Sequence, residues 1–172
     1  INLGAIILET IQKNKEFIMS NIQHIHKSSL FSKNKLPKLV AVSKKQHDYK
    51  IDEAIECGQT IFGENRVQEA LHRWEQRVEK NKDLELRLIG PLQTNKIKLA
   101  LDLFCSIHSI DREKLVLKLS KYPEKIKNID EFFIQVNLAD EAQKSGVSIK
   151  SFDKLLTKAN KFLKINGLMC LP

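Results

Sequence analysis

The stretch LVAVSKK, residues 39–45, decides how the chain is read, because an apolar run of strand length ends there on two lysines. Such a run between polar segments is typical of a parallel strand that is buried on both faces. Side chains alternate along a strand, so Val40, Val42 and Lys44 should share one face, and Lys45 should lie on the other. The functional question is why a core strand should end on an amine.

The same alternation of strand and helix continues to the end of the chain. The predicted strands are 39–42, 60–62, 84–90, 104–110, 132–137 and 165–170. The helical patterns are one long amphipathic helix before the first strand, then 50–57, 65–80, 94–101, 111–119 and 149–162. We expect Gly58 to end the first of these later helices, and Asn65 and Asp111 to be the N-caps of two others.

Strand and helix units without a hairpin pattern indicate a parallel α/β fold. A doubly wound sheet and a (β/α)8 barrel both satisfy this pattern. The usual dinucleotide site of the first needs glycines after the first strand, and VSKKQHD, residues 42–48, has none. The sequence therefore favours the barrel.

Composition narrows the classes of function. The formal charge is +8, but only five of the 29 basic residues are arginines and the lysines are scattered, so we expect no nucleic-acid partner. No apolar run approaches the roughly 20 residues of a membrane span. Three widely spaced cysteines indicate neither a disulfide framework nor a metal site, and we expect a cytoplasmic protein.

In a parallel barrel, the loops after the carboxyl ends of the strands build the site. The polar or functional residues at these predicted positions are Lys44, Lys45, Glu64, Asn65, Gln93, Asn95, His108, Ser109, Asn137 and Met169. This set holds no carboxylate pair, no metal-ligand cluster and no Ser-His-Asp arrangement that the sequence could identify.

A lysine at the end of a buried strand can form a Schiff base with a carbonyl compound, and strand alternation favours Lys44 over Lys45 for this role. Only the neutral amine attacks a carbonyl, so burial at the barrel mouth would have to favour that form. The alternative is that both lysines are strand-end residues whose charged ends reach water.

Seven blocks resemble one known family in order and at suitable spacing. They are LVAVSK (39–44), FGENRVQEA (62–70), LIGPLQTNK (88–96), HSIDREKL (108–115), IQVN (134–137), KSG (144–146) and GLM (167–169). The resemblance is to the pyridoxal phosphate homeostasis proteins, whose fold is that of the N-terminal domain of alanine racemase. It covers nearly the whole chain from residue 39.

The resemblance implies a single (β/α)8 barrel domain, residues 1–172, that binds pyridoxal 5′-phosphate (PLP) as a Schiff base on Lys44. It implies that Asn65, His108, Asn137 and Met169 are cofactor-binding residues and that no residue is catalytic. For Asn65 a helix cap, and for Met169 a place in the core, stay open as alternatives.

The chain departs from the family pattern at two places. Leu86 and Arg87 stand where the family often has Trp-His or His. The family also continues beyond GLM with segments that would supply the last two strands and the phosphate site. We therefore expect a barrel that is incomplete at the C-terminus, with weak or absent PLP binding in this form.

The family is associated with holding and releasing PLP and with balance of the vitamin B6 pool, not with catalysis. PLP-dependent apo-enzymes are the expected recipients, and we expect a monomer. The alternative function is a PLP-dependent amino-acid racemase of the same fold. Racemisation in that relative needs a second base, a tyrosine from an additional domain, and the tyrosines here are Tyr49 and Tyr122.

Overall fold

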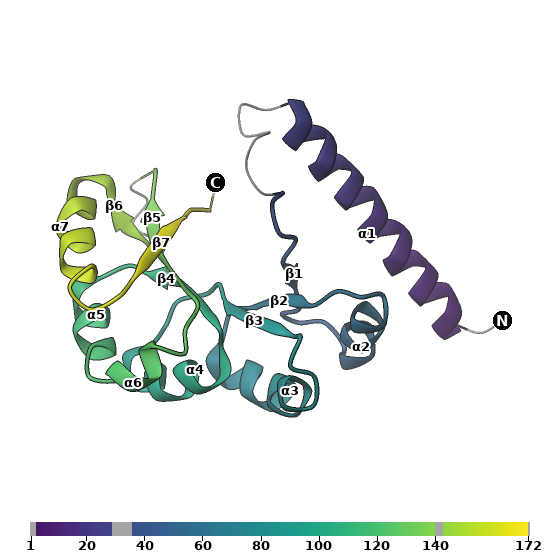
Figure 1. Ribbon diagram of the computed structural model, residues 1–172, viewed down its shortest axis with the longest axis horizontal. Helices are drawn as coiled ribbons and strands as arrows, with labels where there is room; N and C mark the ends of the chain where they lie inside the picture. Colours follow the sequence, from purple (N-terminus) through teal and green to yellow (C-terminus); the bar gives the residue numbers. More distant parts are fainter. Residues whose placement is uncertain (1–2, 29–35, 140–142, 172) are drawn as a thin grey trace. The chain divides into compact units, whose positions relative to one another are not determined.

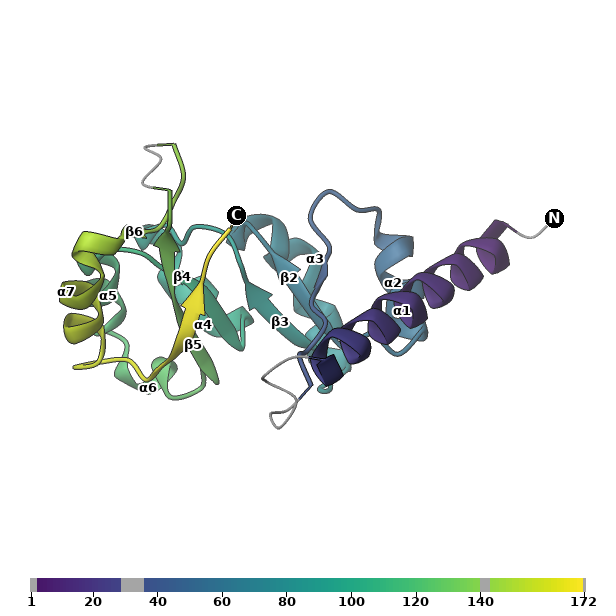
Figure 2. The ribbon, with the colours of Figure 1, turned by 90° about the horizontal axis from the view of Figure 1, so that it is seen from above.

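The computed structural model describes residues 3–28, 36–139 and 143–171. The chain forms two compact units, residues 1–62 and 63–172, and each is described by itself. Figure 1 gives the labels of the helices and strands, and Figure 2 shows them after a quarter turn. Within the described residues no helix is long and apolar enough to cross a membrane.

The first unit contains two helices and the first strand. Its elements are α1 (Leu3–Ser28), β1 (Ala41–Val42), α2 (Asp48–Glu56) and the beginning of β2 (Ile61–Glu64). Helix α1 confirms the predicted long helix and packs on α2, where Lys15 Nζ donates a hydrogen bond of 2.9 Å to the carbonyl of Cys57. The side chain of Gln59, which is buried, bonds the carbonyls of Leu39 and Ile61 and so links the two strand segments.

Helix α2 ends as the sequence predicts. Gly58 follows the C-cap residue Cys57 and has a φ of +73°, in the left-handed region that glycine adopts readily. Its N–H donates to the carbonyl of Ile55, and the N–H of Gln59 donates to that of Ala54. This pair of bonds is the Schellman arrangement, which satisfies carbonyls that have no partner further along the helix.

The first strand is less buried than we predicted. Val42 is 47% exposed, Ser43 is buried and Lys44 is exposed, so the expected alternation holds but the expected burial on both faces does not. The physical reason is that only Ala41 and Val42 form a strand, and the chain turns immediately after Ser43. A strand this short leaves one of its faces open to water.

The second unit repeats strand and helix along the rest of the chain. After the end of β2 come α3 (Val67–Lys80), β3 (Glu85–Leu88), the short 3₁₀ helix η1 (Thr94–Lys96), α4 (Ile97–Leu103), β4 (Ser106–Ile110), α5 (Glu113–Leu119), α6 (Pro123–Ile126), β5 (Glu131–Asn137), β6 (Val147–Ser148), α7 (Ile149–Ala159) and β7 (Ile165–Met169). The bounds of all predicted strands are confirmed to within two residues. The two-residue strand β6 and the one-turn helix α6 were not predicted.

The strands of this unit pair in parallel from β3 onward. Strand β4 lies between β3 and β5, and both β7 and β6 pair with β5. At the other end, the N–H of Ile89 donates to the carbonyl of Glu64 at the end of β2. The parallel α/β prediction is therefore confirmed.

Helices α3 to α7 cover one side of this sheet (Figures 1 and 2). The strand residues that alternate toward the helices are buried and apolar, among them Leu86, Leu88, Ile107, Phe132 and Ile134. The opposite side carries Arg87, His108, Phe133 and Gln135. Helices on a single side are the arrangement of a barrel wall, whereas a doubly wound sheet is covered on both sides.

Two predicted N-caps are wrong. Helix α3 begins at Val67 with Arg66 as its N-cap, and α5 begins at Glu113 with Arg112 as its N-cap, and neither cap makes a side-chain cap hydrogen bond. In both cases the chain stays extended for one residue more than the cap pattern assumed. Asn65 and Asp111 consequently lie before the helices, and the carboxylate of Asp111 pairs with the guanidinium of Arg112.

The three cysteines are free thiols, and they should differ sharply in reactivity. Burial raises the pKa of the Cys105 thiol to about 11, so almost none of it is thiolate at neutral pH. Cys170 is exposed. With iodoacetamide at about pH 8, peptide mapping should find Cys170 alkylated and Cys105 alkylated only after denaturation. Equal rates in the folded chain would contradict this burial.

Candidate functional site

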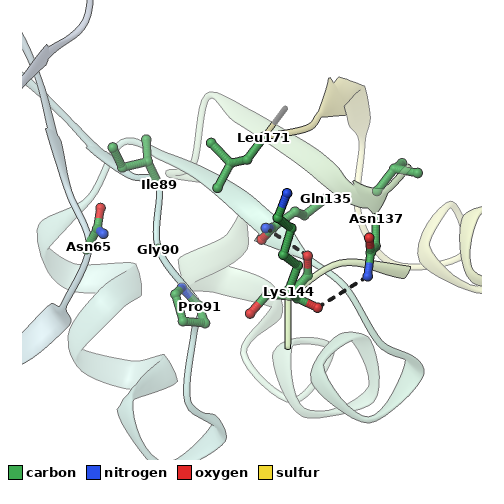
Figure 3. A pocket seen from close by; sticks show the side chains of 10 residues that line it. Asn65, Ile89, Gly90, Pro91, Gln135, Asn137, Lys144 and Leu171 are labelled. Carbon is green, nitrogen blue, oxygen red and sulfur yellow. Dashed lines mark hydrogen bonds between the residues drawn. The ribbon is translucent and has the colours of Figure 1, made fainter. Parts of the chain in front are cut away.

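A cavity of about 330 Å³ opens at the carboxyl ends of β3 and β5. Figure 3 shows its lining, which comes from five segments of the second unit. The lining residues are Asn65, Ile89, Gly90, Pro91, Gln135, Val136, Asn137, Lys144, Ser145 and Leu171. A cavity of this size, at this end of a parallel sheet, is suited to one small molecule.

Gly90 allows the segment after β3 to approach Asn65 closely. A Cβ atom at position 90 would lie 2.2 Å from the carbonyl oxygen of Asn65 and 2.6 Å from its Cα. Only glycine fits there, because the colliding atoms belong to the backbone and cannot swing away. This contact holds one wall of the cavity, and it explains why Asn65, at the end of β2, reaches the cavity.

Two amides of β5 make the opposite wall. Gln135 Nε2 donates a hydrogen bond of 3.2 Å to the carbonyl of Ser145, and Asn137 Nδ2 donates one of 3.4 Å to the carbonyl of Lys144 (Figure 3). Gln135 is 4% exposed, and its Oε1 has no hydrogen-bond partner among the described residues. Buried acceptors are seldom left without a donor, so this oxygen is a candidate ligand contact.

His108 lies on a strand irregularity that the sequence did not reveal. The pairing of β4 with β5 shifts between Ile107 and Ile110, so that His108 and Ser109 together occupy the level of Phe133. This is the pattern of a β-bulge, which often redirects side chains beside functional sites. The rings of His108 and Phe133 lie 4.3 Å apart between centroids, and His108 Nε2 and Ser109 Oγ lack hydrogen-bond partners within the described chain.

The environment of His108 keeps its imidazole neutral. Its pKa is lowered to about 4, chiefly because burial penalises the charged ring and secondly because of the positive charge of Arg87. Arg87 itself is buried and lies between two carboxylates, with bonds of 2.6 Å to Glu85 and 2.8 Å to Glu131. The same two carboxylates help to raise the pKa of Arg87, although its burial opposes them.

The lowered pKa of His108 predicts a pH dependence of stability. The unfolded chain, with a histidine pKa near 6.5, takes up a proton before the folded chain does, so stability is full above that value. It should fall by on the order of 1 kcal/mol as the pH drops toward 4, allowing for solvent screening of this partly exposed ring. Urea unfolding at about pH 7 and about pH 4.5 should show this loss, and His108→Gln should reduce it. An equal loss in both chains would refute the assignment to His108.

Lys44 belongs to the first unit, at the turn that follows β1. The N–H of Gln46 donates to the carbonyl of Ser43 at 3.1 Å, and Lys45 in this turn has a φ of +59°. A bulky residue in the left-handed region is unusual and costs energy, and such residues often mark functional sites. The expected burial of Lys44 is not seen, because the turn directs the chain away from the strand and leaves the side chain exposed.

The remaining predicted positions divide into two groups. Asn65 and Asn137 line the cavity, whereas His108 and Met169 do not. Met169 is half-buried at the end of β7, where it pairs in register with Gln135. Glu64 is fully buried and accepts hydrogen bonds of 3.1 Å from both Arg73 and Trp74, which indicates a structural role.

Sequence reasoning missed Gln135 and Gly90 as site residues. Gln135 lies inside a predicted strand, where an uncharged polar residue between apolar neighbours could have been recognised as facing the barrel interior. Gly90 has no such pattern. The collision that requires glycine there is visible only once Asn65 is placed beside it.

The comparisons with solved structures identify the class of fold. PipY of Synechococcus elongatus was solved without PLP and with PLP bound. The structure without PLP matches 88% of this chain and 71% of its own, with a TM-score of 0.72 at 32% identity. The structure with PLP matches 87% of this chain and 70% of its own, with a TM-score of 0.71 at 31% identity. Alanine racemase from Bacillus anthracis matches 89% of this chain and 39% of its own at a TM-score of 0.51 and 20% identity. Fold and site thus define part of an α/β barrel of the alanine racemase type.

Curated proteins then identify the family, although no family model matches the chain. The pyridoxal phosphate homeostasis protein of Pasteurella multocida is 36% identical over 165 residues, which are 95% of this chain and 70% of that protein. That of Buchnera aphidicola is 34% identical over 167 residues, 96% of this chain and 72% of its own length. This chain belongs to the pyridoxal phosphate homeostasis protein family, as the resemblance of its sequence blocks implied.

Proposed function

We infer that this chain binds PLP and acts in PLP homeostasis. The observation that carries the inference is the combination of family membership with a small cavity at the carboxyl ends of the parallel strands. PipY, a solved relative at 31% identity, holds PLP in one of its structures. The membership alone would leave the site unspecified, and we propose that it is this cavity.

The residues present are compatible with PLP. The cofactor offers an aldehyde for a lysine amine, a ring nitrogen and a hydroxyl group for hydrogen bonds, and an aromatic face. Lys44 would supply the amine, and Asn65 and Asn137 would supply amide groups. The unpartnered Nε2 of His108 and Oε1 of Gln135 are buried polar atoms of the kind that a bound group satisfies. Met169 would contribute apolar contact beside Gln135.

The residues of the site support a binding protein without catalysis. A bound PLP supplies an electron-withdrawing ring, so that catalysis would depend on the acids and bases around it. Apart from Lys44 and His108, which are assigned above to the cofactor, the cavity lining contains one ammonium group, from Lys144, and no carboxylate, imidazole or phenol. Tyr122, one of the two tyrosines that could serve as a second base, is half-buried before the short helix α6 and does not line the cavity. An alanine racemase assay with PLP should therefore give no turnover, and measurable turnover would favour the racemase alternative.

The proposed function also includes the domain organisation, the oligomeric state, the recipients of PLP and the location in the cell. We propose that residues 1–172 belong to a single PLP-binding barrel domain that is monomeric and passes PLP to apo-enzymes. We also propose a cytoplasmic location, which is supported by three cysteines that remain thiols in the structure. Mixing the PLP-loaded chain with a PLP-dependent apo-enzyme and following recovery of its activity would test the transfer.

Trapping of the cofactor tests the proposal most directly. The chain is incubated with PLP, reduced with borohydride, digested and mapped by mass spectrometry. Label should be found on the peptide that contains Lys44, at PLP concentrations where exposed surface lysines such as Lys98 remain unlabelled. Uniform labelling of surface lysines, without preference for Lys44, would contradict the proposal.

A further inference from the structure

We propose that the outer side of α7 and the groove beside it form a docking surface for an acidic segment of a partner protein. We call this surface the lysine face and define it by Lys150, Lys154, Lys158 and Lys161. None of these lysines lines the cavity at the ends of β3 and β5. The inference goes beyond the proposed function, because a surface of this kind does not depend on PLP.

The positive charge of the chain is concentrated on three helices. Residues 113–127 and 149–164 contain α5, α6 and α7, and they hold ten lysines against three acidic residues. Their net charge is +7, so the rest of the chain supplies only +1 of the total of +8. Helices α5 and α7 pack against each other (Figures 1 and 2), so lysines that are scattered along the sequence are gathered in the fold.

The four lysines of the face follow one side of α7. They are separated by four, four and three residues, the spacing that brings side chains onto one face of a helix. Ala159, which is fully buried, lies on the opposite face. From Lys150 to Lys158 the row extends along about 12 Å of helix. Lys161 continues it in the turn after α7, where it lines the same groove as Lys154 and Lys158.

The groove beside this row lies between α7 and the start of α5. It has a volume of about 410 Å³, and its lining residues are Glu113, Asp153, Lys154, Thr157, Lys158 and Lys161. Lys154 Nζ pairs with Glu113 Oε1 at 2.9 Å, and among the described residues it is the one lysine of the face that forms an ion pair. Like charges four residues apart on a helix repel one another, so carboxylates of a partner would stabilise the face.

Two acidic residues in the groove favour a protein as the partner. Glu113 and Asp153 lie among the lysines, and both would be repelled by a nucleic-acid backbone or an anionic lipid surface. A protein can instead present carboxylates to the lysines and a donor to Glu113 or Asp153, which is the electrostatic complementarity of protein interfaces. Residues 113–127 and 149–164 also contain no arginine, the side chain best suited to phosphate. Two copies of this chain could not pair their lysine faces with each other, because both are positive.

Exposed apolar side chains at the two ends of the row supply contact area of the kind that a protein interface uses. Ile149 precedes Lys150, Phe162 follows Lys161, and both apolar side chains are exposed. Interfaces combine apolar contacts with a polar and charged rim. The lysines would therefore attract and orient an acidic segment, while the two apolar side chains would add buried area.

The test uses two synthetic alanine-based helical peptides that differ only in charge. One carries glutamate at every fourth position, and the other carries glutamine there. The acidic peptide should shift amide signals of the ¹⁵N-labelled chain at residues 150–161, and its affinity should fall as salt is added. The glutamine peptide should bind at least about tenfold more weakly, because the ion pairs are lost. Failure of the acidic peptide to bind, or equal affinity of the two peptides, would overturn the inference.

Two double substitutions with the same change of charge locate the surface. Lys158→Glu with Lys161→Glu reverses charge in the groove and should weaken the acidic peptide at least about tenfold. Lys80→Glu with Lys82→Glu changes two exposed lysines at the end of α3 and should weaken it less than about twofold. Equal weakening by both pairs would mean that net charge alone attracts the peptide, and would refute the docking surface. Circular dichroism verifies that the variants fold, and if one does not, the two peptides still decide on the unmodified chain.

Two other anionic probes test the kind of partner. A single-stranded RNA of mixed sequence and vesicles that contain phosphatidylserine are each added to the complex of the chain with the acidic peptide. At physiological salt neither should displace the peptide, because Glu113 and Asp153 oppose a surface that is negative throughout. Displacement by either probe at the concentration of the peptide or below would overturn the assignment to a protein partner.

Lys44→Ala keeps this inference apart from the proposed function. That variant should lose the PLP label and bind the acidic peptide unchanged, whereas Lys158→Glu with Lys161→Glu should keep the label on Lys44. An unmodified chain that traps PLP but does not bind the peptide would overturn the docking surface alone. A chain that binds the peptide but traps no PLP on Lys44 would overturn the proposed function alone.

Discussion

Lys44→Ala should abolish the borohydride-trapped label on the peptide that contains residue 44. A covalent link to PLP needs a primary amine, and no other group in that position can replace it. The loss should therefore be complete, unlike the partial loss that follows removal of one noncovalent contact. The measurement is the mass of the reduced peptide after incubation with PLP, together with the absorbance of the bound cofactor before reduction.

Lys45→Ala provides the matched control, because it removes a neighbouring lysine of equal charge from the same turn. It should retain the label on Lys44. The variant also separates the turn from the side chain, because alanine would keep the left-handed φ of residue 45 while the long side chain of lysine is removed. If Lys45→Ala lost the label and Lys44→Ala kept it, strand alternation would have selected the wrong lysine.

Gly90→Ala should produce the largest loss of stability of any single methyl addition in the cavity wall. The new methyl group would lie 2.2 Å from the carbonyl oxygen of Asn65, so the segment after β3 must move away from the end of β2. That movement would strain the hydrogen bond of 3.0 Å between Ile89 and Glu64. We expect the free energy of unfolding to fall by about 3–5 kcal/mol, measured by urea denaturation.

Gly58→Ala is the control, because it adds the same methyl group at a glycine with open surroundings. The nearest atom to its Cβ would be Lys15 Nζ at 3.7 Å, so the cost is limited to holding alanine at a φ of +73°. This conformation costs about 1–2 kcal/mol. A cost for Gly90→Ala no greater than that for Gly58→Ala would mean that Asn65 and residue 90 are further apart in solution.

The strands were predictable, and so was the start of α7 at Ile149, but the starts of α3 and α5 were not. A buried parallel strand requires a run of apolar residues, and runs such as 132–137 leave few alternatives. A helix start depends on one or two dihedral angles, and Arg66 and Arg112 remain extended where the cap patterns assumed helix. Strand β6 was missed because two residues are too few to establish an alternation.

The candidate site was predictable to a similar degree. Asn65 and Asn137 could be assigned from their positions after predicted strands, because the carboxyl ends of parallel strands meet at one edge of the sheet. The bulge that raises His108 and Ser109 to the level of Phe133 could not, since it depends on the register between β4 and β5. The exposure of Lys44 also depends on a turn whose left-handed residue is a lysine instead of the glycine that would have indicated it.

The ion cluster around Arg87 has a consequence for how this sequence can change. Arg87 is the shared partner of Glu85 and Glu131, and its side chain is 7% exposed. A single exchange of Arg87 for histidine would leave two carboxylates without the guanidinium that they share. Lineages that carry arginine here should therefore retain both glutamates, and lineages that carry histidine should have lost at least one of them. The three positions should be inherited as a unit.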